Sequence, residues 1–381
     1  MIFGCKRVKE SGRMNIGVPK EIKRHEYRVG ITPHGVRTYT SHGHNVIIQT
    51  GAGIGSGYAD EEYRTHGARL AETAEEVFRS SDMIVKVKEP LPEEYALFKE
   101  GQILFTYLHL AANIELAKEL MSRGVRAVAY ETIELADRTL PCLTPMSEIA
   151  GRLSVQEGAK YLEKEFGGRG ILLGGVPGVP RGNIAILGGG VVGTNACKIA
   201  AGIGANVTVL DINAKRLAYL DDIFGSRITT LYATESNIEH ILTEADILIG
   251  AVLRPGESAP RLVRKEHLKE MKSGAVLVDV AIDQGGCAET SRPTTHDEPI
   301  YIVDDVVHYC VANMPGAVAY SSTIALTSVT LSYGLLIADN GLKAAMQSDP
   351  SLRRGLNIAN GACVHEAVAR SCGIPYQEYR A

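Results

Sequence analysis

The chain has 381 residues, of which 45% are hydrophobic and 22% are charged, and its formal net charge is −4. This length is typical of two globular domains that each bury a core, and the weakly acidic charge argues against nucleic-acid binding. The seven cysteines form no C-x-x-C pair, which argues against a disulfide framework or a metal site and favours a reducing cytoplasm.

The first 13 residues are basic and carry no apolar run after them, so they do not form a secretory signal. Met14 directly precedes a strand-like segment, and we therefore expect residues 1–13 to be an upstream extension. The most apolar segment, 316–338, is interrupted by several serines and threonines. It predicts a buried helix between domains rather than a membrane span.

Strand and helix patterns alternate along most of the chain, which predicts an α/β fold with two parallel, Rossmann-like sheets. In the first part we expect strands at 15–18, 45–49, 83–87, 103–108 and 127–131, with helices that include 60–70 and 114–123. A long helix at 147–166 and a hairpin-like stretch at 173–182 follow. Further strands are expected at 184–187, 206–210, 227–232, 246–251, 275–282, 299–303 and 306–311, and then helix to about residue 361.

The clearest motif is an apolar strand that leads into Gly188, Gly190 and Gly193 with the spacing G-x-G-x-x-G. The first glycine allows a tight turn, the second allows backbone to approach a pyrophosphate, and the third allows the helix to pack on the strand. The helix N-terminus then faces the phosphates. Asp211 ends the next strand, where a carboxylate binds the ribose hydroxyls and selects NAD over NADP. The pattern predicts an NAD site.

This motif lies in the middle of the chain, between an α/β segment and a helical segment. We therefore expect residues 143–319 to form an NAD-binding domain inserted into a discontinuous substrate domain of residues 14–142 and 320–381. The long helices at the two crossings are the expected hinges.

Four polar residues are predicted at strand ends or in the loops that follow, where an NAD enzyme binds its substrate: Arg28, Lys88, His109 and Asp283. Arginine suits bidentate capture of a carboxylate, lysine suits a second oxygen, and histidine exchanges protons near neutral pH. Each residue also has a structural interpretation. Arg28 can pair with a neighbouring glutamate at the surface, Lys88 can be solvated, His109 can be a core histidine, and Asp283 can cap a turn. Together they indicate oxidation of a small amino or hydroxy acid in one cleft.

From Met14 to near the C-terminus the sequence resembles the bacterial alanine dehydrogenases. The motifs that carry this resemblance are Ile16-Gly-Val-Pro-Lys-Glu21, Arg28-Val-Gly-Ile-Thr-Pro33, Val87-Lys-Glu-Pro90, Thr106-Tyr-Leu-His-Leu110, Leu173-Gly-Gly-Val-Pro-Gly-Val-Pro180, Asp283-Gln-Gly-Gly-Cys287, Ser291-Arg-Pro-Thr-Thr-His296 and His308-Tyr-Cys-Val-Ala-Asn-Met-Pro-Gly316. The family is typically hexameric and converts L-alanine to pyruvate and ammonium with NAD, reversibly.

The resemblance implies that Arg28 and Lys88 bind the substrate, that His109 is the acid/base and that Asp283 is its partner carboxylate. It implies further cofactor-binding residues, namely Ser147, Val191, Val192, Asp211, Arg216, Val252, Leu253, Val280, Ala281, Ile282, Asp283, Arg292, Val311, Ala312, Asn313 and Met314. The sequence departs from the family at Ala233, where a serine is frequent, and at Ala319-Tyr-Ser-Ser322, where the family usually has proline and a basic residue.

Three alternatives remain open at the level of the sequence. The nearest is the NAD-binding subunit of a proton-translocating transhydrogenase, which would bind NADH without deaminating alanine alone. A lysine- or saccharopine-type dehydrogenase would need acidic groups for a longer cationic substrate, and no such cluster is evident. A non-enzymatic NAD-sensing protein would have no use for a proton-transfer pair.

Overall fold

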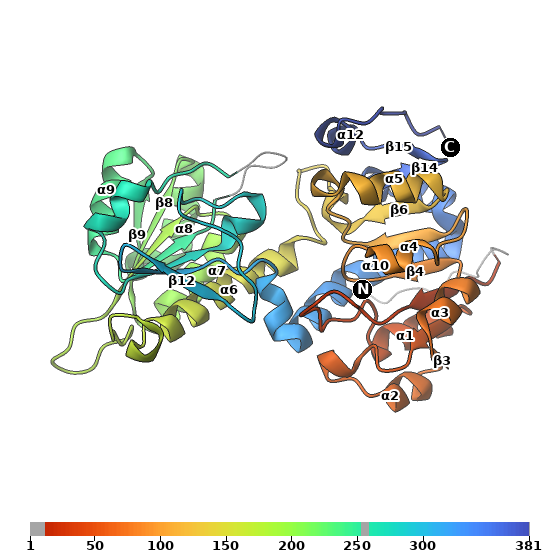
Figure 1. Ribbon diagram of the computed structural model, residues 1–381, viewed down its shortest axis with the longest axis horizontal. Coiled ribbons are helices and arrows are strands. Elements are labelled where there is room, and N and C mark those ends of the chain that lie inside the picture. The colour runs from red at the N-terminus through yellow and green to blue at the C-terminus, as the bar shows by residue number, and fades with distance from the viewer. Residues whose placement is uncertain (1–11, 253–258, 381) are drawn as a thin grey trace. The chain divides into compact units, whose positions relative to one another are not determined.

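The computed structural model describes residues 12–252 and 259–380 (Figure 1). The chain divides into two compact units. The first contains Met1–Met146 and Val318–Ala381, and the second contains Ser147–Ala317. Most of the expected upstream extension, 1–13, lies outside the described residues, as does Leu253. The first unit is therefore discontinuous in sequence, with the second unit inserted into it.

The first unit is built on an eight-stranded sheet of order β15-β14-β6-β5-β4-β1-β2-β3. Neighbours from β3 to β6 are parallel, whereas β14 is antiparallel to β6 and β15 to β14. The strands are β1 (Asn15–Val18), β2 (Asn45–Gln49), β3 (Arg69–Ala71), β4 (Met83–Val85), β5 (Ile103–Thr106), β6 (Arg126–Ala129), β14 (Leu356–Ala359) and β15 (Ala362–Cys363). The order reverses between β1 and β4, which is where open α/β sheets bind ligands.

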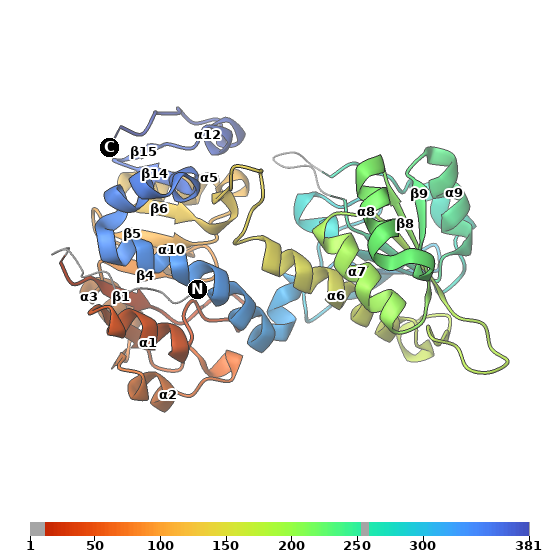
Figure 2. The same ribbon diagram turned by 180° about the vertical axis from the view of Figure 1, so that it is seen from behind.

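Helices cover both faces of this sheet, as the buried, nearly continuous apolar residues of its central strands require. Figure 2 shows α1 and α10 across one face, and Figure 1 shows α5 across the other. The helices of this unit are α1 (Pro33–Ser41), α2 (Asp60–Thr65), α3 (Ala74–Ser80), α4 (Pro92–Tyr95), α5 (Ile114–Ser122), α10 (Ala319–Ser348), α11 (Pro350–Arg354) and α12 (Glu366–Cys372).

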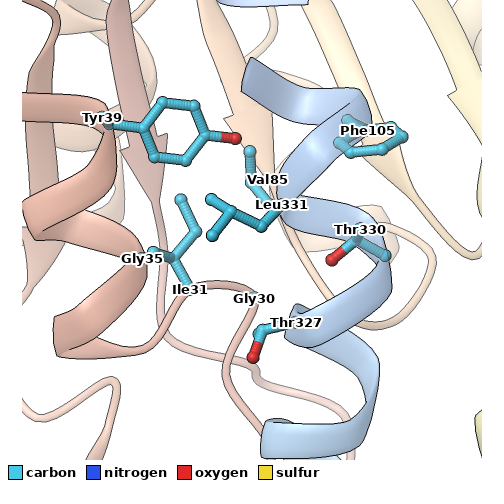
Figure 3. A pocket seen from close by; sticks show the side chains of 9 residues that line it. All are labelled: Gly30, Ile31, Gly35, Tyr39, Val85, Phe105, Thr327, Thr330 and Leu331. Carbon is cyan, nitrogen blue, oxygen red and sulfur yellow. The ribbon is translucent and has the colours of Figure 1, made fainter. Parts of the chain in front are cut away.

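Helix α10 packs on α1 and on the central strands, around a cavity of about 10 Å³ (Figure 3). Its lining includes Tyr39 from α1, Phe105 from β5 and Leu331 from α10. This volume is about that of one water molecule, so the interface is closely packed. Among the described helices, Met314–Ser348 is the one long and apolar enough to cross a membrane. Because one side of α10 is buried in the first unit, core packing accounts for its apolar composition.

The second unit is built on a seven-stranded sheet of order β12-β13-β11-β10-β7-β8-β9, parallel except for β12. Its strands are β7 (Asn183–Leu187), β8 (Asn206–Asp211), β9 (Thr229–Tyr232), β10 (Ile247–Gly250), β11 (Val276–Asp279), β12 (Ile300–Val303) and β13 (Val306–Tyr309). Its helices are α6 (Thr144–Tyr161), which begins in the first unit, α7 (Val191–Gly202), α8 (Ala214–Phe224) and α9 (Glu235–Glu244). The order again reverses once, between β7 and β10.

The expected fold class, α/β with two Rossmann-like sheets, is confirmed. Several expected elements end earlier than predicted, and three differ most from the structure. The helix at 60–70 ends at Thr65, because Gly67 turns the chain with a φ of +96° and β3 follows. The strand at 275–282 ends at Asp279, whose side chain accepts the Ala281 N–H and begins a 3₁₀ turn.

The third error concerns the C-terminal segment, which does not stay helical to residue 361. Gly341 breaks the helical geometry inside α10, and the chain then forms β14, which pairs with β6. The apolar segment Leu356–Ala359 is buried at every position, so tertiary pairing rather than local periodicity decides its conformation.

Gly193 provides a test of the strand–helix packing in the second unit. A Cβ at this position would lie 1.8 Å from the Gly188 carbonyl oxygen, so Gly193→Ala requires the backbone to move. We expect a loss of about 1–3 kcal/mol in the free energy of unfolding, measured by urea denaturation. Gly202→Ala, in the same helix but in open space, is the matched control. It should be neutral or stabilising by up to about 1 kcal/mol. Equal stability of the two variants would contradict the packing role.

Candidate active site

Charged side chains gather at the carboxyl ends of β1, β4, β5 and β6 in the first unit. The loop after β1 carries Arg28, the segment after β4 carries Lys88, and the segment after β5 carries His109. Glu131 follows β6. Because parallel strands end at one edge of the sheet, these residues share that edge on both sides of the switch between β1 and β4.

Arg28 is buried and paired with Glu26. The Arg28 Nε and Nη2 atoms each donate to one oxygen of the Glu26 carboxylate at 2.6 Å, and Arg28 Nη1 donates to the Met146 sulfur at 3.1 Å. Burial would lower the pKa of Arg28, but the hydrogen bonds and charge of Glu26 raise it above its usual value. Arg28 therefore does pair with a neighbouring glutamate, as its structural interpretation predicted, although the pair is buried and not at the surface.

A second ion cluster joins the segment after β4 to the loop after β1 and to α4. The side chain of Lys86 is fully buried and donates to Glu94 Oε1 at 2.7 Å and to Glu21 Oε2 at 3.1 Å. Burial opposes the charge on Lys86, but the two carboxylates raise its pKa above the usual range. Removing one member of such a cluster would leave a buried charge without its partner, which costs about 3–5 kcal/mol in proteins.

Glu21 connects this cluster to Lys88. Its Oε1 atom accepts the backbone N–H of Val87 at 2.6 Å and that of Lys88 at 3.3 Å. The Thr106 hydroxyl, at the end of β5, donates to the Lys88 carbonyl at 3.0 Å. Lys88 itself is half-buried, and its charge helps lower the pKa of Glu26. The Lys88 backbone is therefore held on both sides.

His109 is exposed rather than a core histidine, and it lies three residues beyond the end of β5. Its backbone has a φ of +49°, in the left-handed region, and its N–H donates to Glu131 Oε1 at 2.7 Å. The ring Nδ1 lies 3.4 Å from Glu89 Oε2. Burial would raise the pKa of Glu89, but His109 and Lys23 lower it to about 2.

The second unit carries the glycine-rich turn between β7 and α7. Gly188 has a φ of +100°, and a Cβ there would lie 2.7 Å from the Ala251 carbonyl oxygen. Gly190 begins α7 without a side-chain cap, and a Cβ there would have nothing within 4 Å. The helix N-terminus therefore presents backbone N–H groups beside open space. This arrangement fits a dinucleotide pyrophosphate.

Asp211 and Arg216 hold the glycine-rich turn from β8 and α8. The Asp211 carboxylate accepts the Gly189 N–H at 2.7 Å and the Asn213 N–H at 2.8 Å. Asn213 caps α8 by accepting the N–H groups of residues 215 and 216, which places Arg216 in its first turn. Arg216 donates to the Gly189 carbonyl and to the Thr194 hydroxyl. A half-buried carboxylate at the end of β8 fits recognition of a ribose.

The loop after β11 is organised by Asp279 rather than by Asp283. Asp279 is fully buried and accepts the Cys287 N–H at 2.8 Å and the Ser291 hydroxyl at 2.5 Å. Asp283 does not close the strand as expected. It is exposed on the 3₁₀ turn of Val280–Gln284, four residues beyond the strand end.

The other expected cofactor residues belong to the second unit and lie on several of its elements. Arg292 is exposed and stacks over the Tyr301 ring at 4.2 Å, and Asn313 has a left-handed φ of +69°. The remaining members are half-buried or buried, except for exposed Val191: Ser147, Val191, Val192, Val252, Val280, Ala281, Ile282, Val311, Ala312 and Met314.

Sequence reasoning did not identify Glu21, Lys86, Glu89, Glu131 or Asp279 as site residues. The Val87-Lys-Glu-Pro90 motif contained a signal for Glu89, because it puts a carboxylate beside Lys88. Within the ranges 12–252 and 259–380, no cluster of histidine, cysteine and carboxylate ligands could hold a metal ion. The six cysteines in these ranges are buried and free.

Comparisons with known proteins agree with this arrangement. Residues 17–150 match the family description "Alanine dehydrogenase/PNT, N-terminal domain", and residues 154–366 match "Alanine dehydrogenase/PNT, C-terminal domain". The alanine dehydrogenase of Methanococcus maripaludis is 58% identical over 364 residues, which cover 95% of this chain and 98% of that protein. The alanine dehydrogenase of Bacillus subtilis is 57% identical over 364 residues, with coverage of 95% and 96%.

Solved structures give the same result. An L-alanine dehydrogenase matches with a TM-score of 0.92 and 55% identity, covering 94% of this chain and 99% of that chain. A transhydrogenase from Sinorhizobium meliloti matches with a TM-score of 0.79 and 24% identity, covering 93% and 99%, which shows similarity of fold alone. The sequence matches and the two-unit architecture together show that the chain belongs to the alanine dehydrogenase/PNT family.

Proposed function

We propose that the protein is a cytoplasmic, NAD-dependent L-alanine dehydrogenase. It would convert L-alanine, NAD and water reversibly to pyruvate, ammonium, NADH and a proton. The observation that carries this proposal is the grouping of Arg28, Lys88 and His109 at one sheet edge, in a chain 58% identical to an alanine dehydrogenase. The free, buried cysteines support a reducing compartment. A hexameric assembly is proposed from the family resemblance.

Arg28 and Lys88 are the proposed partners of the substrate carboxylate. Glu26 neutralises part of the Arg28 charge and fixes the plane of its guanidinium group through two hydrogen bonds of 2.6 Å. Lys88 supplies a further positive charge at the same sheet edge. A planar guanidinium and an ammonium group suit a carboxylate, and fixing it also fixes the direction of the Cα–H bond.

The glycine-rich turn, Asp211 and Arg216 are the proposed binding elements for NAD. The open space at Gly190 and the uncapped start of α7 support this assignment, because a pyrophosphate could approach the backbone there. When bound, the nicotinamide would supply the chemistry of a hydride acceptor. The chain's own contribution is to bind the adenosine ribose and the phosphates and to hold the substrate in a dry site.

His109 is the proposed acid/base. After loss of hydride from Cα, the substrate is an iminium ion, and water adds to its carbon to form a carbinolamine. His109 takes the proton released by the water and gives it to the carbinolamine nitrogen. As the C–N bond breaks, His109 accepts the hydroxyl proton, the carbonyl of pyruvate forms, and the departing ammonia takes up that proton to become ammonium. The family resemblance implies Asp283 as the partner carboxylate for this histidine. The reverse reaction uses the same groups.

The first test is NAD reduction by the purified protein with L-alanine, without a partner protein or membrane. We expect turnover with L-alanine, none with D-alanine, and the reverse reaction with pyruvate and ammonium. NADH binding without turnover would reject this function and point to a transhydrogenase-like subunit. A preference for a long cationic amino acid would point to a lysine-type dehydrogenase.

His109→Ala tests the acid/base assignment. Loss of a general acid/base typically lowers turnover by roughly 10²–10⁴-fold, and we expect a loss in that range with NADH affinity unchanged. His66→Ala is the matched control, because His66 is half-buried at the end of α2 and lies outside the site. Turnover of His109→Ala at the level of this control would refute the role.

Asp211→Ala tests the nucleotide site. We expect a lower affinity for NAD, measured by titration calorimetry, because the proposed ribose acceptor is removed. The variant also loses the acceptor of two backbone N–H groups, so a loss of about 1–2 kcal/mol in stability should accompany it. Asp222→Ala, which removes an exposed carboxylate of α8, is the control. An NAD affinity equal to that of the control would contradict the assignment.

A further inference from the structure

The proposed acid/base is held at two points by carboxylates from neighbouring strand ends. We propose that Glu89 is a positioning residue for His109, which accepts the Nδ1 proton and leaves Nε2 as the atom that exchanges protons with the substrate. The Glu89–His109 contact is independent of the proposed function, whereas proton exchange between Nε2 and the substrate rests on it. In this assignment Glu89, and not Asp283, is the carboxylate that pairs with the His109 ring.

The first step of the argument concerns the backbone of His109. A residue other than glycine with a φ of +49° adopts a sparsely populated conformation, which persists only when its surroundings hold it. Glu131 provides that restraint, because its Oε1 atom accepts the His109 N–H at 2.7 Å and the Leu108 N–H at 3.1 Å. The His109 backbone, and with it the direction of the Cα–Cβ bond, is therefore restrained from the end of β6.

The second step concerns the Glu89 carboxylate. Its Oε1 atom accepts a hydrogen bond from Lys23, and its side chain is only 12% exposed. Its Oε2 atom is buried and has no hydrogen-bond partner within the usual distance and angle limits among the described residues. Leaving a buried, ionised acceptor without a donor is costly. The contact recorded for Oε2 is the His109 Nδ1 at 3.4 Å.

The third step gives the tautomer of His109. A carboxylate only accepts hydrogen bonds, so an Nδ1 facing Glu89 must carry the proton, and the Nε2 atom of a neutral ring is then an acceptor. Glu89 stays ionised over the physiological range, because its pKa is about 2. The Tyr107 ring lies at a centroid distance of 5.9 Å from the His109 ring, and the Glu131 carboxylate is engaged by the backbone N–H groups of residues 108 and 109. Glu89 is thus the carboxylate placed to orient the ring.

The experiment uses the nitrogen-15 NMR signals of the His109 ring in the protein without substrate, at a pH where the ring is neutral. His109→Ala identifies the signals. We expect the wild-type ring to be protonated at Nδ1. In Glu89→Leu, which removes the acceptor, we expect a shift toward the Nε2-protonated tautomer. Glu89→Gln keeps an acceptor oxygen without the charge and should restore the wild-type tautomer in part.

The kinetic readout separates positioning from folding. We expect Glu89→Leu to lower kcat with L-alanine by roughly 10- to 100-fold, with little change in the KM for alanine or the Kd for NADH. Glu93→Gln, an exposed carboxylate on α4, is the matched control and should keep wild-type values.

Two results would overturn the inference: an Nε2-protonated ring in the wild type, or an unchanged tautomer and kcat in Glu89→Leu. If Glu89→Leu fails to fold, the wild-type and Glu89→Gln spectra still decide. The spectra need no alanine turnover, so absence of the dehydrogenase reaction would refute the proposed function without deciding the Glu89–His109 contact.

Discussion

Buried carboxylates at the carboxyl edge of the first sheet hold the candidate site in place. Glu21 reaches from the loop after β1 to the segment after β4, where it binds the Lys86 side chain and two backbone N–H groups. Within the loop after β1, Glu26 accepts two hydrogen bonds from the Arg28 guanidinium. A charge taken out of water requires a partner, so each pair fixes the geometry of both members. The strand ends alone would not fix the positions of these side chains as closely.

The same principle extends to His109. Its backbone is restrained by Glu131 from the end of β6, and its ring faces Glu89 from the segment after β4. A carboxylate thus supports each residue proposed to touch the substrate: Glu26 holds the Arg28 guanidinium, Glu21 holds the Lys88 backbone, and Glu131 and Glu89 hold His109. Such support keeps a reacting group within a few tenths of an ångström of its working position, which loops without it do not achieve.

The candidate nucleotide site of the second unit depends on backbone N–H groups more than on charged side chains. Its glycine-rich turn is shaped by the absence of Cβ atoms, since a methyl group at Gly193 would collide with the Gly188 carbonyl oxygen. Asp211 and Arg216 then bind the turn from the next strand and helix. The two units therefore present contrasting surfaces: one rich in paired charges and one built from exposed N–H groups at a helix start. These suit a small amino acid and a dinucleotide respectively.

The sequence by itself determined the α/β class, the glycine-rich turn and the residue types after each strand, because these depend on periodicity and short spacings that neighbouring residues decide. Tertiary structure decided the rest. Lys86 pairs with Glu21, which is 65 residues away in the sequence, and Glu131 is 22 residues from His109. No local pattern connects the members of either pair. The strand Leu356–Ala359 likewise forms because β6 offers it unpaired backbone groups. Burial and long-range pairing are properties of the folded chain, and only the fold could reveal which charges meet.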